Sequence, residues 1–128
     1  MIVDSSALVA ITFAEPGHHD LIAKLAGAPA AGIGTPTLAE TALVLASRLG
    51  RDPRDLVIRL LDEFGIEEVP FGDLHWREAV DAYLRFGRGR HKARLNFGDC
   101  LTYAVARLAN EPLLCTGDDF PHTDLALA

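Results

Sequence analysis

Short apolar segments alternate along this chain with longer segments in which apolar residues return every three or four positions. The first three residues, MIV, are entirely apolar up to Asp4 and predict a buried strand. Further strands are predicted at APAAGIG, IEEVPF and EPLLCT, with a possible edge strand at TDLALA. The intervening segments predict helices over residues 5–15, 17–27, 35–50, 52–64, 73–84 and 96–111. Strands that alternate with helices are typical of an α/β domain built around a mostly parallel sheet.

Several of these helices have apolar faces that we expect to lie in the core. In the helix that Asp73 is expected to cap, the spacing predicts a buried face of Trp76, Ala79, Val80, Tyr83 and Leu84. In the last helix, it predicts a buried face of Phe97, Leu101, Ala104, Val105 and Leu108. Two other helices carry apolar stripes that are wider than one core face requires, at Leu21, Ile22, Leu25, Leu43, Val44 and Leu45. Burial inside the domain and a surface for a partner explain that width equally well.

The composition fits one folded domain. The chain has 128 residues, of which 49% are hydrophobic and 23% charged, and single domains of about 100–200 residues are usual. We therefore expect one domain over residues 1–128. No apolar stretch reaches the ~20 residues of a membrane span, and the N-terminus lacks the basic region of a secretory signal. The only two cysteines, Cys100 and Cys115, are not spaced as a pair, which favours a reducing cytoplasm.

Charge is unevenly distributed along the chain. There are 12 Lys and Arg against 18 Asp and Glu, which gives a net charge of −6. Five of the basic residues lie in RFGRGRHKAR, residues 85–94, which contains no acid, so that only seven remain to offset the 18 acids elsewhere. We call residues 85–94 the basic loop. The pattern predicts one compact basic segment on an acidic body.

Five acidic residues are expected near the carboxyl ends of strands, where open α/β sheets place their sites. Asp4 ends the first strand, and Asp118 and Asp119 follow the strand LLCT. Glu40 and Asp99 lie in the first turns of helices that start at the same edge of the sheet. Carboxylates gathered in one place repel one another unless a cation lies between them. A ligand set of oxygen atoms, without His or Cys, favours magnesium or manganese over zinc.

Most of these acids also fit ordinary helix caps. Glu40 ends TLAE, which matches a capping box, and Asp99 follows Asn96 at the spacing of a cap and a first-turn acid. Asp119, before Phe120, fits a turn or cap residue. Asp4 is harder to explain in this way, because an acid beside a fully apolar strand needs a partner or an ion. A shared metal site and a set of unrelated caps both remain open on the pattern alone.

No other catalytic pattern is present in the sequence. It contains neither the GxSxG elbow of serine hydrolases nor a GxxxxGK[ST] phosphate loop. The five histidines show no metal-ligand spacing, and the two cysteines are more simply interpreted as small packed residues. The carboxylates are therefore the candidate site.

Four segments, taken in order, resemble the motifs of a known family. MIVDSSALVA, the helix LAETALVL, GRGRHKARLNFGDCLTYAVA and PLLCTGDDF are similar to the successive motifs of PIN-domain ribonucleases, and specifically of the VapC toxins of bacterial VapBC toxin–antitoxin pairs. The resemblance covers the chain from end to end, and LNFGDCLTYAVA is its most specific part. It implies a PIN-like α/β/α sandwich with a mostly parallel central sheet and an acidic pocket at the carboxyl ends of the strands.

The resemblance also implies catalytic roles for individual acids. Asp4 and Asp99 match the two acids that hold the metal, and Glu40 matches an acid that assists the metal or its water. TGD resembles the family's T-x-D, which selects Asp118 as the fourth acid, whereas the pair DF that follows makes Asp119 the alternative.

A hydroxyl and the basic loop complete the implied site. Ser6 corresponds to a hydroxyl that lies beside the pocket, and Ser5 replaces a Thr that is common in the family. The basic loop is expected to hold the RNA backbone, unless it is only a solvated loop. The side chains expected to contact RNA are Arg88, Arg90, Lys92 and Arg94.

The reaction that the resemblance implies is metal-dependent endonucleolytic hydrolysis of RNA phosphodiester bonds by the toxin of a toxin–antitoxin pair. The implied cofactor is magnesium, with manganese as the other choice, and it would lower the pKa of bound water. The implied partners are RNA, a VapB-like antitoxin and a second copy of the chain in a homodimer, with no membrane. Two alternatives are a non-catalytic module that binds RNA or protein, and a phosphatase or phosphotransfer domain. Ser6 disfavours the latter, because it stands where haloacid-dehalogenase-type phosphatases have a second Asp.

Overall fold

Each of the four short apolar segments forms a strand of one parallel sheet. In the computed structural model, which describes residues 1–128, the strand order is β3-β2-β1-β4. Ile2 pairs with Gly32 on one side and with Leu113 on the other, so β1 lies inside the sheet. The predicted edge strand at residues 123–128 is reduced to a single bridge between Leu113 and Leu127. The strands are β1 (Ile2–Val3), β2 (Ala31–Gly34), β3 (Ile66–Val69) and β4 (Leu113–Leu114).

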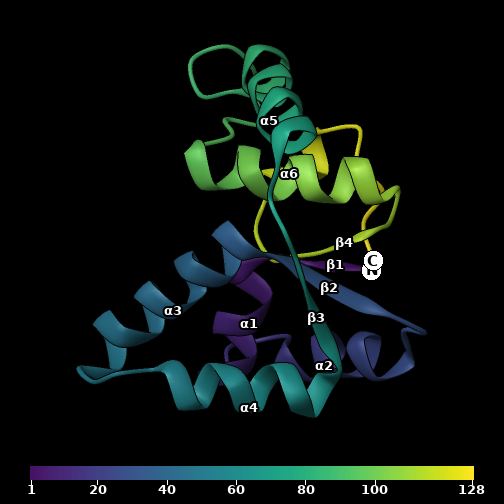
Figure 1. Cartoon of the computed structure of the whole chain (residues 1–128). Helices are drawn as coiled ribbons and strands as arrows, with labels where there is room; N and C mark the ends of the chain where they lie inside the picture. Colours follow the sequence, from purple (N-terminus) through teal and green to yellow (C-terminus); the bar gives the residue numbers. More distant parts are fainter.

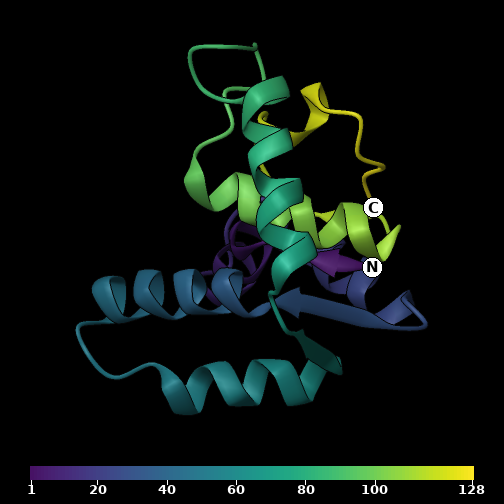
Figure 2. The same ribbon diagram turned by 45° about the horizontal axis from the view of Figure 1, so that its top comes forward.

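Helices cover both faces of this sheet (Figures 1 and 2). They are α1 (Ser5–Thr12), α2 (His18–Gly27), α3 (Thr35–Leu49), α4 (Arg54–Phe64), α5 (Asp73–Phe86) and α6 (Phe97–Ala109), with a 3-10 turn, η1 (Phe120–His122), after β4. Figure 1 shows α5 and α6 on one side of the sheet and α1, α2 and α4 on the other. The predicted α/β/α sandwich with a parallel central sheet is therefore confirmed.

The two residues of β1 face opposite layers, because side chains alternate along a strand. Ile2 packs with Leu113 and with residues of α5 and α6, whereas Val3 packs with Leu114 and with residues of α1 and α2. The next residue, Asp4, ends the strand between these two cores. The same short segment therefore contributes to both cores and supplies the first candidate acid.

Helix α6 lies very close to β2. A Cβ atom at Gly34 would come within 2.7 Å of a methyl group of Val105, so this approach requires glycine. It places α6, which carries Asp99 in its first turn, against the middle of the sheet.

The predicted apolar faces of α5 and α6 are only partly buried. On α5, the buried face consists of Ala79, Ala82 and Phe86, so it is rotated from the predicted face. Trp76 is 49% exposed and Phe97 is 80% exposed. The other residues of the predicted faces that are exposed are Val80, Tyr83, Leu84 and Leu108. The prediction that Trp76 and Tyr83 lie in the core is therefore wrong, because α5 packs on α6 through Ala79, Ala82 and Phe86 instead.

The beginning of α5 also differs slightly from the prediction. Gly72 is the N-cap, and Asp73 is the first helical residue. The Asp73 carboxylate accepts a hydrogen bond from the indole Nε1 of Trp76 at 3.0 Å.

No helix in the structure combines the length and the apolar character that a membrane crossing requires. Cys100 and Cys115 are both free thiols.

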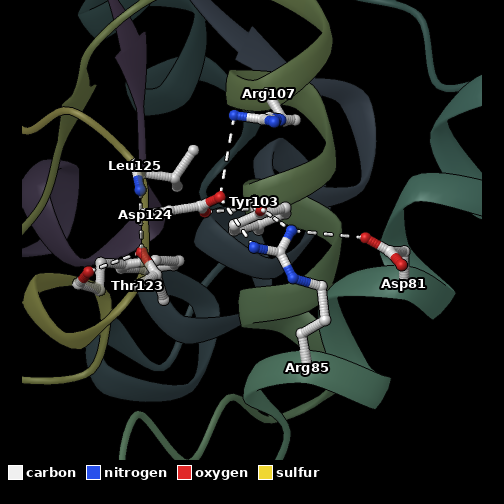
Figure 3. A network of polar contacts seen from close by, with 8 residues as sticks. Asp81, Arg85, Tyr103, Arg107, Thr123, Asp124 and Leu125 are labelled. Carbon is white, nitrogen blue, oxygen red and sulfur yellow. Dashed lines mark hydrogen bonds and ion pairs between the residues drawn. The ribbon is translucent and has the colours of Figure 1, made fainter.

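The segment after η1 is attached to α5 and α6 by a polar network (Figure 3). The hydroxyl of Tyr103, a fully buried residue, donates to Asp124 Oδ1 at 2.7 Å. Arg85 donates to Asp124 Oδ2 at 3.0 Å, and Arg107 lies 3.8 Å from the same oxygen. Burial raises the pKa of Asp124, but hydrogen bonds from Tyr103 and Arg85 outweigh it and leave that pKa below the ordinary value. Arg85, which the sequence places in the basic loop, is thus engaged within this network.

Replacing Asp124 with Ala is expected to lower the free energy of unfolding by about 1–3 kcal/mol, because the buried Tyr103 hydroxyl loses the acceptor for its proton. The loss should be largest at neutral pH. A carboxyl whose pKa is lowered by folding stabilises the fold above its ordinary value of 3.8 and loses that effect as the pH falls through the folded value. Urea unfolding followed by circular dichroism, at pH 7 and in acid, measures both effects.

Asp81 provides the matched control for this network. Its exposed carboxylate lies 3.6 Å from Arg85 and has no contact with Tyr103, so replacing it with Ala should cost much less. Equal stability of the Asp124→Ala and Asp81→Ala variants would contradict the role given to Tyr103.

Candidate active site

Asp4 is a buried carboxylate whose two oxygens both have protein partners. It is the N-cap of α1 and only 5% exposed. Its Oδ2 accepts hydrogen bonds from the backbone N–H of Ser6 at 3.1 Å and from Ser6 Oγ at 2.6 Å. Its Oδ1 accepts one from Thr102 Oγ1 at 2.9 Å. Burying a charge is costly without such donors, and these three hold the Asp4 carboxylate in place.

The two serines after Asp4 connect it to other elements. Ser6 Oγ, besides donating to Asp4, accepts a hydrogen bond from the backbone N–H of Thr116 at 3.0 Å. This contact links the start of α1 to the chain that leaves β4. Ser5 Oγ donates to Glu40 Oε1 at 2.6 Å. The contact from Ser5 was not predicted, and the only signal for it in the sequence is its position next to Asp4.

Glu40 does not cap α3. The N-cap of this helix is Gly34, without a side-chain hydrogen bond, so the capping box that TLAE suggests is not formed. Instead the Glu40 carboxylate, held by Ser5, lies against the first turn of α6. A Cβ atom at Gly98 would overlap this carboxylate. The glycine before Asp99 therefore makes room for Glu40 beside it.

Asp99 is both a helix-cap partner and a member of an acidic cluster. Its backbone N–H donates to Asn96 Oδ1 at 2.9 Å, and its Oδ2 accepts from the backbone N–H of Asn96 at 3.1 Å. Burial raises the pKa of Asp99 to about 6, and the negative charges of Asp4, Asp119 and Glu40 act in the same direction. Asp99 is therefore a helix-cap residue, as one interpretation of the sequence has it, and three other acids also act on its pKa.

The segment after β4 contributes Asp119 to this cluster. Asp118 and Asp119 are both exposed, and Asp119 is the N-cap of η1. Of the two, Asp119 is the one whose charge raises the pKa of Asp99. We call Asp4, Glu40, Asp99 and Asp119 the acidic cluster. The sequence prediction named Asp118 as the fourth acid with Asp119 as the alternative, and it is the alternative that acts on Asp99.

The donor set of the acidic cluster fits a hard divalent cation. All four side chains offer oxygen atoms. Burial raises the pKa of Asp99, the charges of the other three acids add to this effect, and a cation would offset their repulsion. The nearby thiol of Cys115 is a poor ligand, because burial and the charges of Asp4 and Asp99 raise its pKa to about 11. No group of three or more His, Cys, Asp or Glu side chains is arranged closely enough to hold a metal ion in this conformation. The carboxylates of Asp4, Glu40 and Asp99 are instead held by the protein's own hydroxyl and N–H groups.

The basic loop connects α5 to the first turn of α6, where Asp99 lies, and extends away from the sheet (Figure 2). A bridge between Gly87 and Leu95 closes it, and the ring of His91 packs edge-on against Phe86 with 5.1 Å between the ring centroids. Four cations of this loop are exposed and form no ion pair: Arg88, Arg90, Lys92 and Arg94. They are the only members of the basic loop available to an anion, since Arg85 is paired with Asp124.

An apolar groove opens beside the acidic cluster. It has a volume of about 740 Å³, is lined by residues of α3, α6 and the start of α5, and has Glu40 as its only charged residue. Leu43, which is 71% exposed, and Phe97 line it. A second apolar hollow, of about 380 Å³, continues from it along α5 over Val80 and Tyr83. Half of the six residues in the wide stripes singled out in the sequence are instead core, because Leu21, Leu25 and Leu45 are buried.

Comparison with known proteins covers nearly the whole chain. The profile of the PIN domain matches residues 1–125. Ribonuclease VapC36 of Mycobacterium tuberculosis is 48% identical over 126 residues, which cover 98% of this chain and 91% of that protein. Ribonuclease VapC of Mycolicibacterium smegmatis is 38% identical over 126 residues, which cover 98% of each chain.

Solved structures with the same fold have much lower sequence identity. VapC20 of Mycobacterium tuberculosis, described as a Sarcin-Ricin loop cleaving toxin, has a TM-score of 0.78 and 18% identity, covering 99% of this chain and 97% of that one. A toxin–antitoxin complex from Klebsiella pneumoniae has a TM-score of 0.72 and 16% identity, covering 99% of this chain and 95% of that one. At such identities these structures bear on the fold alone.

Proposed function

The chain belongs to the PIN-domain family, among the VapC ribonucleases, and hydrolyses RNA; we propose that it does so with a magnesium ion held by the acidic cluster. The observation that carries the proposal is the convergence of three acids from different elements: Thr102 of α6 holds Asp4, Ser5 holds Glu40, and the Glu40 carboxylate lies against Gly98, next to Asp99. Burial, together with the charges of Asp4, Asp119 and Glu40, raises the pKa of Asp99 to about 6, in line with this arrangement. Carboxylates that raise the pKa of a neighbour destabilise the folded protein, and a bound cation would offset that cost. A phosphatase or phosphotransfer activity is not favoured, because Ser6 occupies the place of a second acid and is bonded to Asp4.

Asp4 and Asp99 are proposed as metal ligands, with Glu40 and Asp119 completing the site. When bound, the ion would lower the pKa of its water and stabilise charge on the phosphoryl oxygens. Asp4 is preorganised for this role, since three hydrogen bonds fix its carboxylate. Glu40 is oriented by Ser5 and is available to accept a proton from the attacking water. Manganese has the same preference for oxygen ligands and is the expected substitute.

We propose that the basic loop binds the RNA backbone. Its four unpaired cations precede the first turn of α6, so a strand of RNA that passes over them also passes the acidic cluster. The cations offset the repulsion between RNA and a chain whose net charge is −6. Substrate phosphates bound there would enter the acidic cluster only together with a divalent cation.

We propose two protein partners, a VapB-like antitoxin and a second copy of the chain. An apolar helix of the antitoxin fits the groove beside Glu40, from which a basic side chain would reach the acidic cluster and displace metal and substrate. The exposed apolar side chains of α5 are proposed to meet their counterparts in a homodimer. Light scattering tests the homodimer, and relief of toxicity by the adjacent small open reading frame tests the antitoxin. We also propose that residues 1–128 act as one nuclease domain.

Removing divalent cations should abolish cleavage. Total RNA is incubated with the purified chain in EDTA and then with magnesium or manganese in excess, and the new ends are mapped by sequencing. We expect no cleavage in EDTA and discrete cleavage sites after either metal is restored, because the ion is needed to activate water at neutral pH. Undiminished cleavage in EDTA would contradict the proposal.

The same assay identifies the fourth acid. Replacing Asp119 with Asn should slow cleavage about tenfold or more, as expected when a residue that supports a metal site is lost. Replacing Asp118 with Asn is the matched control, one residue away and equally exposed, and should leave the rate within about threefold of the unmodified chain. The opposite ranking would make Asp118 the fourth acid and exclude Asp119.

A further inference from the structure

Two buried threonine hydroxyls form a chain that ends on Asp4. Thr102 of α6 is 1% exposed, and its Oγ1 donates to Asp4 Oδ1 at 2.9 Å. Thr37 of α3 is also buried, and its Oγ1 lies 2.9 Å from Thr102 Oγ1. We call Thr37 and Thr102 the hydroxyl pair. It joins two helices to the end of β1 beneath the acidic cluster.

The direction of the hydrogen bonds in this pair is fixed by chemistry. A carboxylate oxygen only accepts, and a hydroxyl has a single proton, so the proton of Thr102 must point to Asp4. Thr37 is then the donor to Thr102. A rotation of either hydroxyl would leave a buried polar group without its partner, which costs about 1–3 kcal/mol. The hydroxyl pair is therefore a rigid, oriented support for Asp4.

The hydrogen bonds on Asp4 are distributed unequally between its oxygens. Each carboxylate oxygen accepts about two hydrogen bonds or metal bonds. Oδ2 already accepts two, from the N–H and the Oγ of Ser6. Oδ1 accepts one, from Thr102, and keeps one lone pair free.

We propose that Thr102, oriented by Thr37, is a positioning residue that holds Asp4 with Oδ1 directed to the divalent cation. The inference rests on the proposed metal-dependent function and adds a support for the ligand that neither the motifs nor the capping pattern indicates. Groups that orient metal ligands in this way typically change metal affinity about 10- to 100-fold when they are removed.

The test uses the full chain and manganese alone as the probe, without RNA. Replacing Thr102 with Val keeps the shape of the side chain and removes the hydroxyl, and isothermal titration calorimetry should then show manganese binding about tenfold weaker or more. Replacing Thr102 with Ser restores the hydroxyl and should return the affinity to within about threefold of the unmodified chain. RNA cleavage by the Val variant should need more manganese for half-maximal rate and recover at excess metal.

Thr41 supplies the matched control. It is buried in α3, and its Oγ1 donates only to the backbone carbonyl of Thr37, at 2.8 Å, without reaching Asp4. Thr41→Val should lose stability as Thr102→Val does, yet bind manganese as the unmodified chain does. If Thr102→Val fails to fold, Thr102→Ala takes its place, since it also lacks the hydroxyl.

Two results would overturn the inference while leaving the proposed function intact. One is unchanged manganese affinity in the Thr102 variants that lack the hydroxyl, and the other is an equal loss in Thr41→Val. An unmodified chain that binds no divalent cation would instead remove the proposed metal site, and the role of Thr102 with it.

Discussion

Replacing Asp99 with Asn is expected to slow RNA cleavage about a thousandfold or more and, in EDTA at neutral pH, to raise the melting temperature of the domain by a few degrees. The loss of activity is expected because Asp99 is a proposed metal ligand, and a bound cation would contribute several kcal/mol to the stability of the transition state. The gain in stability follows from removing one charge from the acidic cluster. Asn keeps an oxygen that accepts the hydrogen bond from the backbone N–H of Asn96, so the helix cap survives.

The gain in melting temperature should depend on pH. Burial, together with the charges of Asp4, Asp119 and Glu40, raises the pKa of Asp99 to about 6, so the folded state binds this proton more tightly than the unfolded chain does. Ionisation of Asp99 therefore costs stability as the pH rises from its ordinary value of 3.8 through about 6, and the full cost is present above that. The two melting temperatures should converge near pH 4 and separate near pH 7, which differential scanning fluorimetry across this range measures.

Asp62 provides the control for both readouts. It is an exposed acid of α4 without an ion-pair partner, so Asp62→Asn should change neither cleavage nor the pH dependence of melting. Manganese should raise the melting temperature of the unmodified chain more than that of Asp99→Asn. Two results would contradict the proposed role of Asp99. One is a lower melting temperature of Asp99→Asn than of the unmodified chain at pH 7, and the other is a cleavage rate above about a tenth of the unmodified rate.

Replacing Arg88, Arg90 and Lys92 together with Ala is expected to weaken RNA binding roughly a hundredfold at 0.1 M salt. Each phosphate contact to a single strand contributes about 0.7 to the slope of log affinity against log salt, so three contacts contribute about 2 units. These side chains are exposed and unpaired, and removing them should leave the fold and metal binding unchanged. Fluorescence anisotropy with a labelled RNA, measured over a series of salt concentrations with the Asp99→Asn chain, gives both affinity and slope.

A triple variant on the other side of the sheet controls for net charge. Arg51, Arg54 and Arg59 are exposed, lie in or next to α4, and change the net charge by the same amount when replaced with Ala. This variant should keep the salt slope of the parent chain. An unchanged slope in the basic-loop variant, or an equal loss in both, would show that the basic loop only faces solvent.

The parts of the fold that could be predicted from the sequence are those with a strong local pattern. Runs such as MIV and EPLLCT are apolar at every position that enters the sheet, so strand position and parallel pairing follow from the alternation with helices. The face that α5 buries could not be predicted in the same way. Ala79, Ala82 and Phe86 pack on α6, while the larger Trp76 and Tyr83 are left on the surface. Periodicity predicted the helix, but it did not predict which face of the helix packs on α6, because that depends on the shape of a partner distant in the sequence.

In the candidate site, too, residues with a local sequence pattern could be predicted, whereas contacts between residues far apart in the sequence could not. Asp4 and Asp99 could be singled out, because the local sequence pattern identifies an acid at the end of an apolar strand or in the first turn of a helix. The choice between Asp118 and Asp119 depends on the path of an exposed turn, which a single sequence does not determine. The contact from Thr102 to Asp4 spans 98 residues and has no local signal except a polar residue on a buried helix face.

The acidic cluster is assembled from segments that are synthesised far apart in time. The backbone N–H of Asp4 is bonded to the carbonyl of Leu114, and Ser6 receives its hydrogen bond from Thr116. Translation produces the N-terminal segment first, so Asp4 leaves the ribosome before β4, Thr102 or Asp119 exists to complete its surroundings. A growing polypeptide of this sequence consequently lacks the assembled acidic cluster that we propose as the nuclease centre. The ribosome, itself built largely of RNA, therefore meets no assembled acidic cluster until the segment up to Asp119 has been made.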